Sequence, residues 1–170
     1  MREVILVVHN IRSCYNVGAL LRSAEGFAVS RVILSGYTPR VHDDSLLPHL
    51  REKLDREIHK TALGAEEMVR INACDDIFSE LASLRQEGWQ IVGLENNVAD
   101  LPLLKLGSPE CSSALKPRVV LVLGEEVGGI NYTLYDIIDL FVEIPMRGRK
   151  ESFNVSVAAG IALFALTMEG

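Results

Sequence analysis

RVVLVLGEEVGG, residues 118–129, joins the clearest apolar run of the chain to a glycine-rich segment. The run at 118–123 is aliphatic after its first arginine, which is typical of a strand buried on both faces of a parallel sheet. Glycines after such a strand allow a ligand to approach the backbone closely, although a plain tight turn is the alternative interpretation. Because ligands of open parallel sheets bind beyond the carboxyl ends of the strands, we expect a functional loop here.

Further aliphatic runs predict strands at 4–8, 31–34, 67–71, 90–94 and 140–144. Apolar residues at helical spacing lie between the first two runs: Val17, Leu20, Leu21, Ala24 and Ala28. Asn16 stands where it can cap this helix. Strand, helix and strand in this order form a βαβ unit, for which a right-handed crossover is expected.

The rest of the chain continues the alternation of strands and helices. A surface loop leading into a polar helix is predicted for 35–60, and an amphipathic helix for 75–87, with Ile77, Phe78, Leu81 and Leu84 on one face and Gly88 ending it. Residues 100–117 contain three prolines and are expected to form a loop, 131–138 a short helix, 145–152 a basic loop and 154–168 a terminal helix. The sequence therefore predicts one α/β domain over residues 1–170, with three layers and a mostly parallel sheet.

Composition excludes several classes of protein. The 170 residues are 48% hydrophobic with a net charge of -6, so any nucleic acid must bind a local basic patch rather than a generally basic surface. The three cysteines form no CxxC pair and the four histidines show no metal-ligand spacing, so we expect neither disulfides nor a metal site. No targeting segment is visible and the longest apolar stretch is short for a membrane span, which favours a cytoplasmic protein without membrane contact.

The terminal helix is apolar around its whole circumference. Its apolar residues are Val155, Val157, Ala158, Ala159, Ile161, Ala162, Leu163, Phe164, Ala165, Leu166 and Met168. One side can pack on the sheet, and the other then needs a partner. We expect a homodimer, with full burial inside one chain as the alternative.

Three loops at the predicted carboxyl edge can carry chemistry: 9–16, 124–130 and 145–152. The glycine segment is not a phosphate-binding P-loop, because Ile130 and Asn131 stand where a lysine and a hydroxyl are required, and two glutamates repel phosphates. A GxGxxG fingerprint is also absent. The 147–150 segment carries three cations that suit an RNA backbone, with a solvated charge run as the alternative.

Three segments together resemble the motifs of the SpoU-type (TrmH-like) RNA ribose 2′-O-methyltransferases of the SPOUT superfamily. NVGALLRSAEGF at 16–27 resembles NxGAxxRxAxxF, LVLGEEVGGI at 121–130 resembles LVxGxExxGI, and IPMRGRKESFNVSVAAGIALF at 144–164 resembles IPMxGxxxSLNVSxAxxIxL. They occur in the family's order and cover most of the chain. Phe153 stands where leucine is usual, and Ala28 where glycine often follows the phenylalanine.

The resemblance implies a C-terminal deep trefoil knot that binds S-adenosylmethionine, methylation of a ribose 2′-hydroxyl in tRNA or rRNA, and a homodimer. Unlike some relatives, this sequence is expected to have no separate RNA-binding extension. The implied cofactor-binding residues are Leu94, Gly124, Ile144 and Phe153. The implied catalytic residues are Arg22, Asn16, Glu126, Ser152 and Asn154. We expect RNA contacts from Arg12, Arg147, Arg149 and Lys150.

Two roles are open for Arg22. The family proposal makes it a general base, but a guanidinium is effectively always protonated, so gripping the phosphate beside the target ribose is the alternative. Glu126 can orient Arg22 or Asn16. Two other classes of function compete with the enzyme: a noncatalytic protein of the same fold that binds RNA or cofactor, and a flavodoxin-like signalling domain. The second lacks the acidic cluster expected after the first strand, where the chain reads Val8, His9, Asn10.

Overall fold

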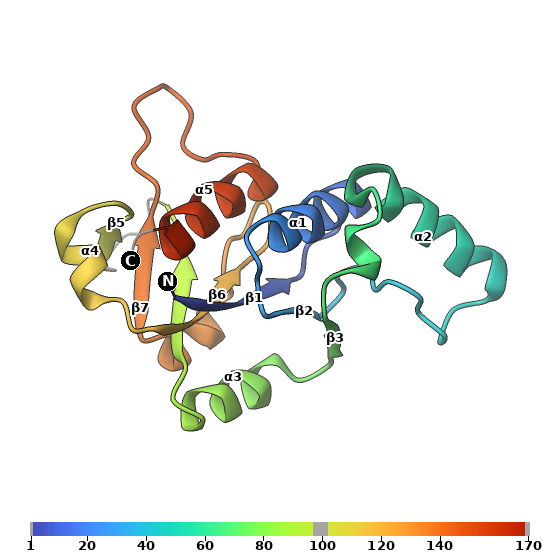
Figure 1. The fold of residues 1–170 in the computed structure, drawn as a ribbon, viewed down its shortest axis with the longest axis horizontal. Coiled ribbons are helices and arrows are strands. Elements are labelled where there is room, and N and C mark those ends of the chain that lie inside the picture. The colour runs from blue at the N-terminus through green and yellow to red at the C-terminus, as the bar shows by residue number, and fades with distance from the viewer. Residues whose placement is uncertain (1, 97–101, 169–170) are drawn as a thin grey trace.

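The computed structural model describes residues 2–96 and 102–168, and these form one α/β unit around a single sheet (Figure 1). The sheet contains the strands β1 (Glu3–His9), β2 (Arg31–Ser35), β3 (Ile71–Cys74), β4 (Gln90–Leu94), β5 (Leu103–Lys105), β6 (Arg118–Leu123) and β7 (Leu140–Glu143). Their order is β3-β2-β1-β6-β4-β7-β5, and every pair of neighbours in it is parallel. This order differs from the 2-1-3-4-5 arrangement of flavodoxin-like domains.

Helices cover both faces of the sheet. Figure 1 shows α1 (Cys14–Gly26), α2 (Pro48–Ala62) and α5 (Val155–Met168) on one side of it and α3 (Ile77–Gln86) on the other. Alternation along β1 explains the two cores: Val4, Leu6 and Val8 pack with α1 and α5, whereas Ile5 and Val7 pack with α3 and the 3-10 helix η2 (Tyr132–Ile137). The predicted three layers and parallel sheet are confirmed.

The strands β1 and β6 form the centre of the sheet, as their sequences predict. Residues 4–8 and 119–123 are all buried, and Val7 of β1 faces Val122 of β6 in the pairing register. Burying each such aliphatic side chain contributes about 1.5–3 kcal/mol. The carboxyl ends of both strands therefore lie side by side, and the loops that follow them are held at one edge of the sheet.

The start of α1 corrects the prediction for Asn16. Ser13 is the capping residue, and its Oγ accepts a hydrogen bond from the backbone N of Asn16 at 3.2 Å. Asn16 therefore lies inside the first turn, where its side chain is available for other contacts. Further along the helix, a Cβ on Gly18 would overlap the backbone of Ile58, so α1 and α2 pack more closely than any other residue at position 18 would allow.

Four other predictions from the sequence were wrong in part. The strand predicted at 67–71 lies instead at Ile71–Cys74 (β3), and the 3-10 helix η1 (Ala65–Glu67) precedes it. Because β3 is an edge strand with little buried surface, its hydrophobic pattern is weak. The predicted loop 100–117, of which 100–101 lie outside the described residues, contains the strand β5 and the helix α4 (Pro109–Ala114). The helix forms because Pro109 is at its first position and Ser108 caps it. The helix predicted at 131–138 is the 3-10 helix η2. Phe78 is 49% exposed, since only Ile77, Leu81 and Leu84 of α3 face the sheet.

The last helix, α5, has two different apolar faces. Ala159, Ala162, Leu163 and Leu166 are buried against the rest of the chain, and α5 packs on α1 and β1. Its opposite face carries exposed apolar side chains: Val157, Ile161, Phe164 and Met168. Within the described part of the chain, this helix and the others are too short or too polar to cross a bilayer.

Candidate active site

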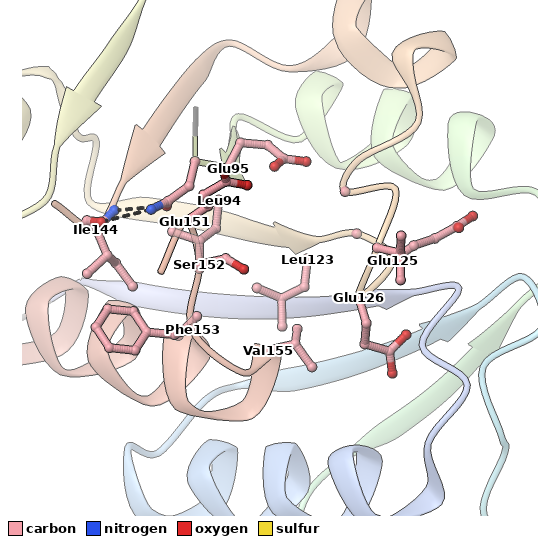
Figure 2. Close-up of a pocket in the computed structure, with 15 residues that line it drawn as sticks. Leu94, Glu95, Leu123, Glu125, Glu126, Ile144, Glu151, Ser152, Phe153 and Val155 are labelled. Atoms are coloured by element: carbon pink, nitrogen blue, oxygen red, sulfur yellow. Dashed lines mark hydrogen bonds between the residues drawn. The ribbon is translucent and has the colours of Figure 1, made fainter. Parts of the chain in front are cut away.

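A cavity of about 310 Å³ opens at the carboxyl edge of the sheet, between the ends of β4, β6 and β7 and the start of α5. Figure 2 shows its apolar wall, formed by Leu94, Leu123, Ile144, Phe153 and Val155. The volume lies at the lower end of the range of about 300–1,000 Å³ that is usual for small-molecule sites. A cavity in this position is where a parallel α/β sheet binds its ligand.

All four residues predicted to bind a cofactor line this cavity. Leu94 ends β4, Gly124 follows β6, Ile144 follows β7, and Phe153 lies two residues before the start of α5. These residues span 60 positions of sequence, and the parallel sheet brings them together because successive strands end at the same edge. Phe153 is 41% exposed, so its ring is partly open to solvent at the cavity.

The glycine segment after β6 forms a closed turn. The backbone N of Glu125 donates to the carbonyl of Gly129 at 2.8 Å, and the N of Gly129 donates back to the carbonyl of Glu125 at 3.0 Å. A Cβ on Gly124 would overlap the carbonyl group of Gly129, and Gly129 itself has a positive φ of 67°. Both glycines are therefore required by the shape of this turn.

Glu95 and Asn96 stabilise the turn and the neighbouring strand ends. The carboxylate of Glu95 accepts a hydrogen bond from the backbone N of Ile130, and burial raises the pKa of Glu95. The side chain of Asn96 donates to the carbonyl of Ile144 at 2.9 Å and accepts from its backbone N at 3.3 Å. Sequence reasoning missed both residues; the available signal was that two polar residues follow a predicted buried strand directly, as at the other candidate loops.

Three of the predicted catalytic residues form a chain of hydrogen bonds beside the cavity. The side-chain amide of Asn16 donates to Glu126 Oε1 at 3.3 Å, and the amide of Asn154 donates to Asn16 Oδ1 at 3.2 Å. Asn154 Oδ1 in turn accepts from the backbone N of Ser156 at 2.9 Å in the first turn of α5. Glu126, which lines the cavity, is thus linked through Asn16 to the start of α5.

The other two predicted catalytic residues are placed differently. Ser152 lines the cavity with its neighbour Phe153. Arg22 is exposed on α1 and does not line the cavity, and its side chain makes no hydrogen bond or ion pair within residues 2–96 and 102–168. Of the two partners considered for Glu126, Asn16 is therefore the one that contacts it in a single chain.

Charges of opposite sign gather in neighbouring parts of the site. Four carboxylates line the cavity: those of Glu95, Glu125, Glu126 and Glu151. No lysine or arginine is among the described residues that line it. The three cations of the basic loop, Arg147, Arg149 and Lys150, are exposed and directly precede Glu151. Arg12 lies on the other side, where its backbone N donates to Glu126 Oε2 at 3.5 Å. The cavity suits a ligand with positive charge and an apolar group, and the cations around it suit an anion.

Comparisons with known proteins agree in one family. The model of the SpoU rRNA Methylase family matches residues 3–164. The chain is 35% identical over 161 residues to a 23S rRNA (guanosine-2'-O-)-methyltransferase RlmB of Nitrosomonas europaea, covering 95% of this chain and 54% of that protein. It is 33% identical over 163 residues to the RlmB of Xylella fastidiosa strain 9a5c, covering 96% and 57%. The chain thus spans about half the length of these curated relatives.

Solved structures share the fold. A TrmH/SpoU tRNA modifying enzyme of A. aeolicus superposes with a TM-score of 0.77 at 22% identity, covering 99% of this chain and 76% of that one. An AdoMet-bound rRNA methyltransferase from Sinorhizobium meliloti superposes with a TM-score of 0.75 at 21% identity, covering 96% and 55%.

Proposed function

Because the chain belongs to the SpoU rRNA methylase family, we propose that it transfers a methyl group from S-adenosylmethionine to a ribose 2′-hydroxyl of RNA. The observation that carries this proposal is the cavity at the carboxyl edge, which residues of the second and third family motifs line and to which Asn16 of the first motif is hydrogen-bonded through Glu126. The names of the RlmB relatives, which are guanosine 2'-O-methyltransferases, support the type of reaction. Whether the RNA is tRNA or rRNA is a separate matter for experiment.

The cavity fits the proposed cofactor. S-adenosylmethionine supplies a methyl group bonded to a positively charged sulfur. Leu94, Ile144 and Phe153 would hold its apolar adenosine part, and the backbone at Gly124 would approach it closely. The lining carboxylates match the positive charges of the cofactor, and the same carboxylates disfavour a polyphosphate ligand.

The residues of the chain would then align the hydroxyl and exclude water. Transfer breaks the carbon–sulfur bond, forms a carbon–oxygen bond and releases the hydroxyl proton, so the oxygen must be held in line with the methyl group. Asn16 is held between Glu126 and Asn154 and therefore has a fixed orientation at the edge of the cavity. The apolar wall formed by Ile144 and Phe153 favours loss of the sulfonium charge, because a dry site solvates that charge poorly.

Arg22 is exposed on α1 and lies outside the cavity lining, so its proposed role in the reaction depends on RNA or a second copy of the chain approaching that surface. Since its guanidinium stays protonated, gripping the phosphate beside the ribose and stabilising the developing alkoxide is the role that its chemistry favours. We also propose a homodimer that covers the exposed apolar face of α5, with the site close to the interface. Val157, Ile161 and Phe164 would then be buried by the second copy.

The proposal also covers the topology of the chain, the compartment in which it acts and the residues that bind RNA. We propose that the C-terminal segment is threaded as a deep trefoil knot; in its support, β7 pairs with β4 and β5, and the chain then returns so that α5 packs on α1 and β1. Residues 3–164 would form one methyltransferase domain that acts in the cytoplasm without a metal ion. Arg12, Arg147, Arg149 and Lys150 would bind the RNA backbone.

Calorimetry with S-adenosylmethionine and a tritiated-methyl assay on bulk RNA test this function together. We expect binding and transfer by the wild-type protein. Asn16→Ala removes a hydrogen bond to a charged partner, worth about 1.5–3 kcal/mol, and should slow transfer at least about tenfold. Asn72→Ala, at an exposed asparagine of the edge strand β3, is the matched control. Binding without transfer to any RNA would instead support a noncatalytic protein of this fold.

A further inference from the structure

An exposed arginine and an exposed tyrosine form a pair beside the cavity. The guanidinium carbon of Arg12, in the loop between β1 and α1, lies 5.4 Å from the ring centroid of Tyr37, in the turn after β2. The Tyr37 side chain is 47% exposed. A hydrogen bond that the guanidinium of Arg12 donates to the Tyr37 side chain raises the pKa of Arg12, so the pair carries a positive charge at any ordinary pH. One face of the ring is thus occupied by a cation while much of the residue is open to solvent.

The backbone around Tyr37 is fixed, although its ring is exposed. Asn10 Oδ1 accepts a hydrogen bond from the backbone N of Tyr37 at 3.3 Å. Gly36 has a positive φ of 63°, and a Cβ there would overlap Asn10 Oδ1. On the other side, the hydroxyl of the buried Thr38 accepts from the backbone N of Ile11 at 3.1 Å. The backbone that carries the ring therefore has little conformational freedom to lose when a ligand binds.

The same loop contacts the glycine turn that lines the cavity. The side-chain amide of Asn10 donates to Glu125 Oε1 at 3.3 Å, and the backbone N of Arg12 donates to Glu126 Oε2 at 3.5 Å. Figure 2 shows Glu125 and Glu126 at one end of the cavity, opposite Ile144 and Phe153. Asn10 therefore connects the Tyr37 turn to Glu125, which lines the cavity, so the Arg12–Tyr37 pair and the cavity lie at the same edge of the sheet.

We propose that Arg12 and Tyr37 form a stacking platform for an unpaired base of the RNA, next to the nucleotide whose ribose enters the cavity. Proteins that recognise single-stranded RNA stack its bases on aromatic rings and on arginine planes, and arginine also contacts the phosphates. An exposed ring under a cation offers both contacts. The platform rests on the proposed function, since it selects unpaired RNA for that reaction. A pair that only stabilises the loop is the competing explanation.

The platform can be tested by steady-state methylation of bulk RNA, with the cofactor affinity measured separately by calorimetry. Stacking of one base predicts that Tyr37→Ala raises the KM for RNA by about 5-fold to about 150-fold, with kcat and the affinity for S-adenosylmethionine unchanged. Tyr37→Phe keeps the ring but loses the hydrogen bond with Arg12, so its KM for RNA should stay well below that of Tyr37→Ala. Phe78→Ala removes an aromatic residue of equal exposure (49%) from the helix on the opposite face of the sheet, and serves as the matched control.

A second measurement does not depend on methyl transfer. An RNA hairpin with 2-aminopurine in its loop should lose fluorescence on binding the wild-type protein, because the base stacks, and should lose much less with Tyr37→Ala. If the wild-type protein transfers no methyl group but quenches this probe, and Tyr37→Ala quenches it much less, the proposed function fails and Tyr37 still stands as a base-binding platform. An unchanged KM and unchanged quenching in Tyr37→Ala overturn the platform alone. It is equally overturned if Tyr37→Phe is as impaired as Tyr37→Ala, because the ring then does not matter.

Discussion

Replacing Gly124 by alanine should disrupt the cavity, because the added methyl group would meet backbone atoms rather than a flexible side chain. The new Cβ would lie closer than 3.0 Å to the carbonyl of Gly129 and the backbone N of Ile130, where ordinary contact begins at 3.4 Å. Those backbone atoms must therefore move by about 1 Å. The shift acts on atoms that take part in three hydrogen bonds: two between Glu125 and Gly129, and one from Ile130 to Glu95.

The cost follows from these bonds. A backbone hydrogen bond contributes about 1 kcal/mol net, and one to a charged group about 1.5–3 kcal/mol. Allowing for partial relaxation, the turn of Gly124→Ala should be destabilised by about 2–4 kcal/mol in its wild-type shape. If the ligand requires that shape, the dissociation constant for S-adenosylmethionine rises by about 30-fold to about 1,000-fold.

Calorimetry at a temperature where both proteins are folded, verified by thermal unfolding, measures this effect. Gly128→Ala is the control from the same turn, because its Cβ would meet only the flexible side chain of Glu125, at 3.2 Å. We expect that change to alter the affinity by less than about 0.5 kcal/mol. Wild-type affinity in Gly124→Ala would refute the reasoning, since the turn would then not form the binding surface.

Three further predictions concern pH, the arginine and the oligomer. Burial raises the pKa of Glu95, so the contribution of this residue to the free energy of unfolding is present below its unfolded-state pKa and is lost as pH rises through its folded-state pKa. The melting temperature of Glu95→Gln should therefore increase relative to that of the wild type as pH rises. A difference in melting temperature that does not change with pH would contradict this. If Arg22 binds a phosphate, Arg22→Ala should lose activity in single-turnover methylation, and Arg22→Lys should keep part of it with an unshifted pH dependence. Full activity of Arg22→Ala would exclude both the phosphate-binding role and the general-base role. Ile161→Asp places a charge on the exposed apolar face of α5 and should convert a dimer to a monomer in sedimentation, whereas Phe78→Asp on α3 should not; an unaffected dimer would place the interface elsewhere.

Elements with strong local signals were predicted correctly, and elements stabilised mainly by tertiary contacts were not. The aliphatic runs of β1 and β6 are buried on both faces, so their composition alone identifies them. By contrast, β5 has three residues and pairs only with β7, and β3 lies at the other edge of the sheet. Their pairing partners come from distant segments, and no local pattern records that pairing.

The same distinction applies to the site. Leu94, Gly124, Ile144 and Phe153 were predicted through motif resemblance, and the structure places them around one cavity. Periodicity alone would have assigned none of them a ligand. Glu95 was missed because its function in the structure is to accept a hydrogen bond from a backbone N 35 residues away, which no spacing in the sequence indicates.

The distribution of charge limits how RNA can approach the proposed site. The cavity is lined by four glutamates, the protein carries a net charge of -6, and a phosphate inside the cavity would be repelled. The cations that we propose for RNA lie outside it, on Arg12 at one side and in the loop 147–150 at the other. RNA held by these two groups would present a ribose to the cavity while its phosphates stay outside. On this reasoning, the carboxylates keep the cavity available to a cationic cofactor in the presence of a polyanionic substrate. Replacing Glu126 by glutamine should therefore weaken binding of S-adenosylmethionine more than binding of S-adenosylhomocysteine, which lacks the sulfonium charge, and equal weakening of both would show that charge is not the basis of the selection.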